Sequence, residues 1–187
     1  MGLLERFRRD EVVGTRVLVC AVGSGFDGVL KRDADAYKNH YSVTTAATFA
    51  GIDELLRAIR EGQYDVVHLL CRVDSSGQID GSGTRGTELI EDCCASGVKL
   101  LWVASENEPD AYIKGFYARG KRLNLVMTIR RNGQNFAEFL DHLLSRMLNG
   151  DAMPVAWNDL CPQVPGSAHP DAPECIFFAG RGGVRLR

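Results

Sequence analysis

Short apolar runs alternate with longer amphipathic segments along almost the whole chain. The runs are rich in β-branched residues, which is typical of strands buried in a sheet. Six predicted strands are Arg16–Gly23, Ser42–Phe49, Asp65–Val73, Lys99–Ala104, Leu123–Ile129 and Cys175–Gly180. The segments between them place apolar residues at helical spacing. The predicted helices are Leu30–His40, Ile52–Glu61, Thr87–Ser96, Pro109–Arg119 and Gly133–Asn149, with a helical turn at Val155–Leu160.

Strict alternation of strands and helices predicts an α/β fold. We expect a three-layer sandwich in which helices cover both faces of a mostly parallel six-stranded sheet. The run Asp65–Val73 is apolar on both faces and is therefore expected at the centre of the sheet. No repeat or linker divides the chain, so residues 1–187 are predicted to form a single domain. Residues 1–14 are then an N-terminal extension and residues 181–187 a basic tail.

Composition narrows the class of protein. The chain is 45% apolar and 25% charged, which is typical of a soluble globular domain. No apolar run approaches the ~20 residues that span a bilayer, and the first residues lack the apolar core of a secretory signal. We therefore predict a cytoplasmic protein that does not bind membranes. The net charge of −2 argues against general nucleic-acid binding.

Six cysteines and four histidines show no spacing typical of metal ligands. We therefore predict no metal and no bound cofactor. Most of the cysteines lie in apolar surroundings and are expected to be buried, reduced thiols. These are Cys20, Cys71, Cys93, Cys94 and Cys175.

The carboxyl ends of parallel strands are where such folds bind ligands. Gly23, Gly25 and Gly28 form a G-x-G-x-x-G pattern directly after the first predicted strand. However, the second strand ends in Thr48-Phe49-Ala50, without an acidic residue for a ribose, and no clean apolar helix starts at Gly28. A flexible glycine turn is the favoured interpretation. The polar loop that follows the third strand carries an Asp80-Gly81 turn signal, with a small hairpin expected around Ile79.

Arginines and a serine follow the third, fourth and fifth strands. If those strands are neighbours, Arg72, Arg130 and Arg131 surround Ser105, and the cluster suits a phosphate or carboxylate. The alternative is that these arginines are solvated loop residues.

A hydrolase built on these residues fits poorly. His68 lies inside an apolar strand and is interpreted as a core residue. Because His68 lies inside the strand, its ring is poorly placed to act as a base for Ser105 at a strand end. Cys71 would face the opposite side of the sheet from His68, so these two residues are not expected to form a dyad.

The order of these pieces resembles the CHAT family of caspase-like domains, from about Leu30 to Gly180. The matching segments are Ala47-Thr48, Asp53-Glu54-Leu55-Leu56, Tyr64-Asp65-Val66-Val67-His68-Leu69, the glycine hairpin 77–81, Leu100–Ser105, Phe136–Gly150, Ala156–Leu160 and Cys175–Gly180. Active members of the family carry a catalytic His after the third strand and a nucleophilic Cys after the fourth. Here Arg72 and Ser105 occupy those two positions.

The resemblance implies a protease fold without protease chemistry, since both the thiolate and its activating imidazole are replaced. It implies an inactive module that binds a protein partner or a second copy, in bacterial defence or cell-death signalling. It also implies pairing through the edge of the last strand. The alternative function is a Rossmann-like sensor that binds a nucleotide or another anion through Gly23, Gly25, Arg72, Ser105, Arg130 and Arg131.

Overall fold

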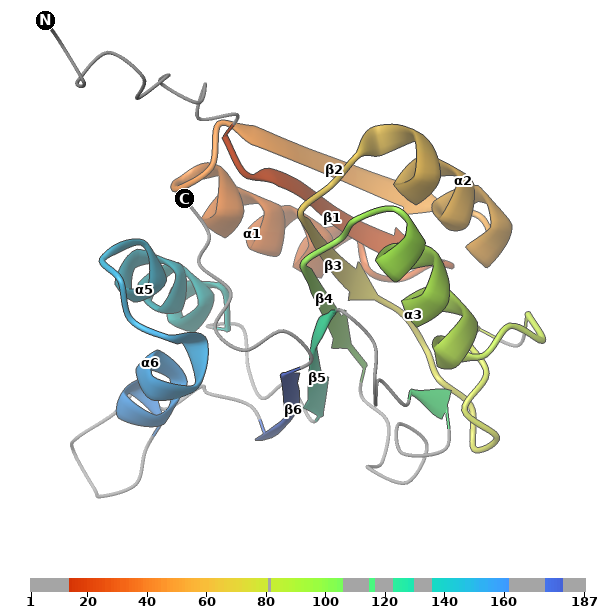
Figure 1. Cartoon of the computed structure of the whole chain (residues 1–187). Helices are drawn as coiled ribbons and strands as arrows, with labels where there is room; N and C mark the ends of the chain where they lie inside the picture. Colours follow the sequence, from red (N-terminus) through yellow and green to blue (C-terminus); the bar gives the residue numbers. More distant parts are fainter. Residues whose placement is uncertain are drawn as a thin grey trace, which may run out of the picture.

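The computed structural model describes residues 14–80, 82–105, 115–116, 123–129, 136–161 and 174–179, and the last of these segments only as backbone. It has the predicted α/β architecture (Figure 1). The strands are β1 (Arg16–Val22), β2 (Val43–Phe49), β3 (Val66–Leu70), β4 (Leu100–Ala104), β5 (Asn124–Ile129) and β6 (Glu174–Ala179). The helices are α1 (Asp27–Lys38), α2 (Ile52–Gly62), α3 (Gly86–Ala95), α5 (Phe136–Leu148) and α6 (Met153–Leu160).

The strands form one sheet in the order β2-β1-β3-β4-β5-β6. Its parallel part consists of five strands, β1 to β5, and β6 pairs antiparallel with β5 at the edge. The prediction of a mostly parallel sheet is therefore confirmed. β3 lies between β1 and β4, and all five of its residues are buried, as expected for a strand that is apolar on both faces.

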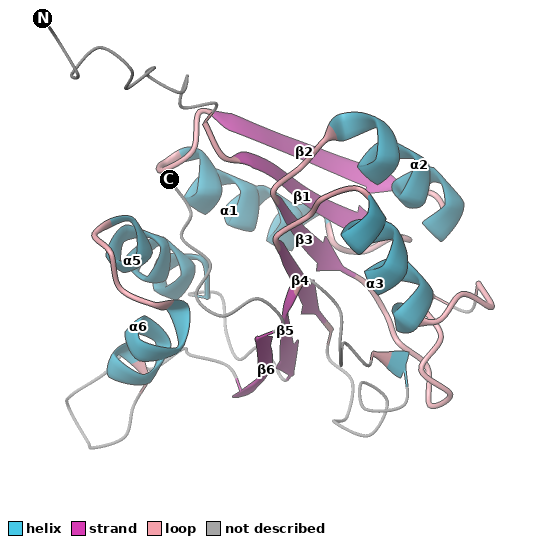
Figure 2. Ribbon diagram, viewed as in Figure 1, coloured by secondary structure: helices cyan, strands magenta, loops and turns pink. Residues whose placement is uncertain are grey.

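Helices cover both faces of the sheet (Figure 2). α2 and α3 pack on one face, and α1, α5 and α6 pack on the other. This arrangement follows from the period-two alternation of strand side chains. In β1, for example, Leu18 and Cys20 point to the first face, whereas Val17 and Val19 point to the second.

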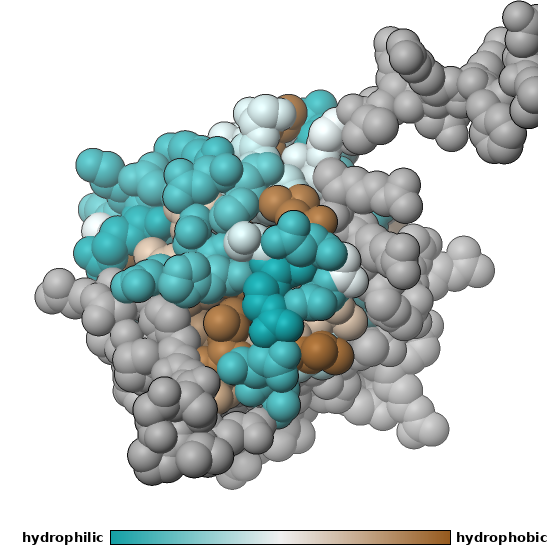
Figure 3. Space-filling model, turned by 90° about the vertical axis from the view of Figure 1, so that its left-hand side faces the viewer, coloured by the Kyte–Doolittle hydropathy of each residue, from teal (hydrophilic) through white to brown (hydrophobic). Residues whose placement is uncertain are grey.

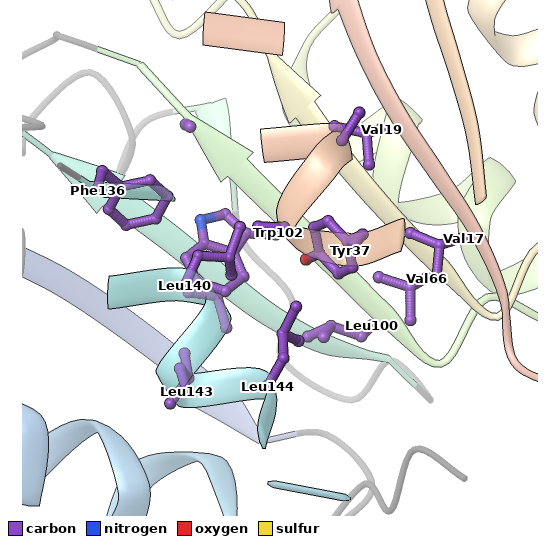
Figure 4. Close-up of a cluster of buried hydrophobic side chains, with 14 of the residues drawn as sticks. Val17, Val19, Tyr37, Val66, Leu100, Trp102, Phe136, Leu140, Leu143 and Leu144 are labelled. Carbon is purple, nitrogen blue, oxygen red and sulfur yellow. The ribbon is translucent and has the colours of Figure 1, made fainter. Parts of the chain in front are cut away.

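The second face is held together by an aromatic cluster beneath α5 (Figure 4). The indole of Trp102 from β4 lies 5.9 Å from the ring of Phe136 and 5.5 Å from that of Trp157, measured between centroids. Phe136 begins the wide apolar stripe that predicted α5, and this stripe is buried except for Leu148 at its end, which is 39% exposed. Near the middle of α5, the Asp141 carboxylate contacts the two residues that follow α1. Its Oδ1 accepts a hydrogen bond from Asn39 Nδ2 at 2.9 Å and lies 3.0 Å from His40 Nε2.

Two boundaries differ from the predictions. α1 begins at Asp27, three residues before the predicted start, and the acidic side chain in its first turn favours a helix N-terminus. β3 ends at Leu70 rather than Val73, because the Arg72 carbonyl accepts the Asp80 N–H and Val73 pairs with Ile79 instead. This pairing is the small hairpin expected around Ile79.

Some predicted segments lie outside the described residues. They are most of the helix Pro109–Arg119, the loop Pro162–Pro173, residues 1–13 of the extension and the tail 181–187. Among the helices of the described chain, none combines the length and apolar character needed to cross a bilayer.

Candidate functional site

The carboxyl edge of the sheet gathers the loops that follow β1, β3 and β4. The order β2-β1-β3-β4-β5 has a switch point between β1 and β3, since β2 is added on one side of β1 and the chain then crosses back to add β3 on the other. Open α/β sheets bind ligands at such a point. The residues around it are therefore the candidate site.

The glycine turn after β1 forms one wall of this edge. Gly23 and Gly25 have φ angles of 82° and 92°, which favour glycine, and the Gly23 N–H donates to the Phe49 carbonyl at 3.1 Å. α1 follows directly at Asp27, with no side-chain cap from Phe26 at its N-terminus. The helix that follows the glycine turn therefore begins three residues earlier than the predicted Leu30, with Asp27 and Gly28 in its first turn, and its sequence DGVLKRDADAYK is largely polar.

Arg72 lies against this glycine turn. Its guanidinium carbon is 5.1 Å from the centroid of the Phe26 ring, within the range of a cation–π contact. A Cβ atom placed on Gly25 would be 3.3 Å from Arg72 Nη2. Arg72 is otherwise exposed, so the structure presents a cation beside the first turn of α1.

Asp80 lies on the other side of the same turn. A Cβ atom on Gly23 would come within 2.7 Å of Asp80 Oδ2, so glycine at this position makes room for the carboxylate. Asp80 has a φ of 49°, and its N–H donates to the Arg72 carbonyl at 2.8 Å. The hairpin therefore brings Asp80 and Arg72 to one place, both against the glycine turn.

The first turn of this hairpin is organised by Asp74. Its Oδ1 accepts the hydroxyl and the N–H of Ser76, at 2.6 Å and 2.8 Å, and the N–H of Gln78 at 3.0 Å. The hydrogen bond from the Ser76 hydroxyl is the main cause that lowers the pKa of Asp74, followed by that from Gln78. Asp74 therefore acts as a local turn-forming carboxylate.

Ser105 follows the strand that neighbours β3 on the side opposite β1. It follows β4, is only 5% exposed, and donates its N–H to the Thr128 carbonyl of β5 at 3.3 Å. Arg72 instead leans over the loop after β1, and β1 and β4 flank β3 on opposite sides. The structure thus brings Arg72 together with Gly23 and Gly25, and directs its guanidinium away from the side of β3 that carries Ser105. Arg130 and Arg131 lie outside the described residues.

His68 is fully buried within β3, as the sequence predicted for a core residue. Its ring stacks on Trp102 with centroids 4.9 Å apart and planes 3° apart. Its Nδ1 lies 3.3 Å from the Tyr37 hydroxyl, and its Nε2 lies 3.6 Å from Oδ2 of the buried Asp33. The imidazole therefore joins β3 to α1 and β4 inside the protein, away from the exposed carboxyl edge.

Sequence reasoning missed Asp33 as a partner of His68. A signal was present, because Asp33 falls at helical spacing with Leu30, Ala34 and Tyr37, the residues that predicted the buried face of α1. A carboxylate on such a face must find a partner, since an unpaired buried charge costs several kcal/mol. The role of Asp80 was missed too, since only the fold brings it to Gly23.

The buried cysteines agree with the prediction of inert thiols. Cys20, Cys71 and Cys93 are buried, and Cys94 is half-buried. Desolvation raises the pKa of Cys71 to about 12, and the nearby Asp80 carboxylate adds to the effect. Burial likewise raises the pKa values of Cys20 and Cys93. Cys71 packs on the face opposite to His68, so this pair cannot form a dyad. The Cys175 side chain lies outside the described residues.

A scan against protein-family models finds no family that matches this chain, and a search of curated proteins finds no match either.

We expect Asp33→Ala to destabilise the protein by about 3–5 kcal/mol, since it removes one partner of a buried pair. Asp35→Ala is the matched control, because Asp35 lies on the same helix in an exposed pair with Lys38 and should cost about 1 kcal/mol or less. Urea denaturation of both variants measures the difference. Equal losses in the two variants would contradict a structural role for the Asp33–His68 pair.

The stability contributed by Cys71 should depend on pH. Its thiol ionises near pH 9.0 in the unfolded chain, but only near 12 in the folded protein. The contribution is therefore complete below about pH 9 and is lost as the pH rises toward 12. Relative to Cys71→Ala, the free energy of unfolding of the wild-type protein should fall by about 1.4 kcal/mol between pH 8 and pH 10. The fall corresponds to the one pH unit by which pH 10 exceeds the pKa of the unfolded thiol. Urea unfolding at both pH values tests this, and a pH-independent difference would refute it.

Proposed function

We propose that this protein is a catalytically inactive caspase-like module that acts by binding a protein partner at the carboxyl edge of its sheet. The family resemblance supplies the protease fold, and the observation that carries the proposal is the position of Arg72. The position that holds the catalytic His in active members bears a cation that cannot accept a proton. The Arg72 guanidinium lies over Phe26 in the loop after β1, which flanks β3 on the side opposite to β4 and Ser105.

The other groups near this edge also favour binding over hydrolysis. Ser105 replaces the nucleophilic Cys and is almost fully buried. The imidazole of His68 is engaged by Tyr37 and Trp102 inside the sheet. The Cys71 thiol has a raised pKa on the opposite face, which keeps it protonated at neutral pH.

The chemistry of the proposed contact follows from Arg72. An exposed guanidinium recognises carboxylates through paired hydrogen bonds, and the Phe26 ring beneath it holds the side chain in place. The partner is therefore expected to present an acidic side chain to this edge. A role in bacterial defence or cell-death signalling follows from the resemblance alone.

Binding and hydrolysis can be measured on the same set of peptides. We expect the wild-type protein to bind acidic peptides on an array, and Arg72→Ala to lose at least ten-fold in affinity. Arg57→Ala, which alters an exposed arginine on α2, is the control and should bind normally. In solution, neither the wild type nor Ser105→Ala should cleave the peptides. Peptide cleavage that Ser105→Ala abolishes would refute the proposal.

A second candidate function is that of a sensor for a nucleotide or another anion. The observation that favours it is the closeness of Arg72 Nη2 to the glycine turn, beside the N-terminus of α1. Glycine turns before a helix suit phosphate groups in α/β folds. Arg130 and Arg131, which the sequence also assigned to such a site, lie outside the described residues.

Thermal unfolding against a panel of nucleotides and inorganic phosphate separates the two functions. A bound anion at about 100 times its dissociation constant stabilises the protein by about 2.7 kcal/mol. For a sensor, one anion should raise the melting temperature of the wild type and of Arg57→Ala, but not of Arg72→Ala. If no anion changes the melting temperature, the sensor function is wrong.

A further inference from the structure

We propose that β2 is a self-association edge, through which two copies of this chain join their sheets by antiparallel pairing of Val43–Phe49 about a two-fold axis at Ala46. This inference concerns a different surface from the carboxyl edge and does not depend on the partner proposed there.

Among the described strands, β2 is the outermost on its side of the sheet and pairs with β1 alone (Figure 1). The register between β1 and β2 runs without interruption over all seven residues of β2. The Phe49 carbonyl accepts the Gly23 N–H, so the backbone groups of Phe49 face β1. Since direction alternates along a strand, the N–H and C=O groups of Thr44, Ala46 and Thr48 face outward.

In the part of the chain that the structure describes, this edge carries no charged side chain, proline or bulge that would block edge pairing. An exposed edge is usually protected by charged side chains, a proline or a bulge. The sequence of β2, VTTAATF, contains no charged residue and no proline, and its unbroken register contains no bulge. Ala46 and Thr48 are exposed, and Val43 is one of three large hydrophobic residues exposed on the described chain, at 40%.

The face of the molecule shown in Figure 3 offers less for a partner than the β2 edge does. On the face in Figure 3, hydrophilic residues cover most of the coloured surface, and hydrophobic residues form only small separate areas. The two remaining exposed large hydrophobic residues, Leu148 and Val155, lie on helices, in α5 and α6. The β2 edge therefore differs from them in offering backbone hydrogen bonds as well as apolar contacts.

The occupant is a second copy because β2 is complementary to itself. About an axis at Ala46, Thr44 of one copy lies opposite Thr48 of the other, and Ala46 lies opposite Ala46. The outward-facing residues thus form three pairs across the axis, since the pairing of Thr44 with Thr48 occurs twice. Each pair exchanges two backbone hydrogen bonds, which gives six in total. Val43 then lies opposite Phe49. Threonine pairs and pairs of an aromatic with a β-branched residue are favourable across strands, and no like charges oppose each other.

This pairing has a geometric consequence for the helices on both faces of the sheet. A two-fold axis perpendicular to the joined sheet keeps α1 of both copies on one face and α2 of both copies on the other. The helices that flank β2 therefore extend the contact beyond the strand itself. The antiparallel strand β6 remains at the far ends of the joined sheet.

Residue 46 is the point where the two copies meet, which allows a charge-swap experiment. Ala46→Lys places two like charges opposite each other, and so does Ala46→Glu. Analytical ultracentrifugation should show a dimer for the wild-type protein and a monomer for each variant alone. An equimolar mixture of Ala46→Lys and Ala46→Glu should form a dimer again.

Ala95→Lys is the matched control, because Ala95 is an exposed alanine at the end of α3, and this variant should remain a dimer. Far-UV circular dichroism verifies that all variants are folded. A monomeric wild type, a dimeric Ala46→Lys, or a mixture that stays monomeric would overturn the proposal. None of these results changes the expected loss of peptide binding in Arg72→Ala, so the two proposals fail independently.

Discussion

The burial of β3 is the constraint on which the rest of the structure depends. All five of its residues are buried, so both faces of the sheet need a helical layer, and any polar side chain within the strand needs a partner inside the protein. His68 is that side chain. Its contacts with Asp33 and Tyr37 of α1 and with Trp102 of β4 meet the requirement. The same contacts set α1 against the centre of the sheet.

This use of His68 determines what the carboxyl edge offers. With the imidazole inside, the exposed groups beside β1 and β3 are a guanidinium, held over Phe26, and carboxylates organised by the hairpin. Such groups recognise charge and shape. The interior role of His68 and the cation at position 72 are the observations on which the proposed binding function of this edge rests.

The sheet also has two edges of different character. β6 closes one side antiparallel to its neighbour, whereas β2 is parallel to β1 and ends the other side with an uncharged strand. An edge strand leaves half of its backbone groups without a partner in the sheet, and these groups favour a further strand. The near-palindromic order of residues in β2 makes a second copy the natural source of that strand.

The sequence by itself determined the fold class and the central position of β3. It also indicated the burial of His68, Cys20, Cys71 and Cys93 and the hairpin around Ile79. These properties depend on local periodicity and on the cost of exposing apolar side chains, both of which are visible along the chain. The tertiary structure alone decided that Asp33 partners His68, that Asp80 meets Gly23, and that Arg72 leans toward β1 and away from Ser105. Each of these contacts joins segments far apart in the sequence, and its geometry depends on strand order and side-chain direction, which no local pattern encodes.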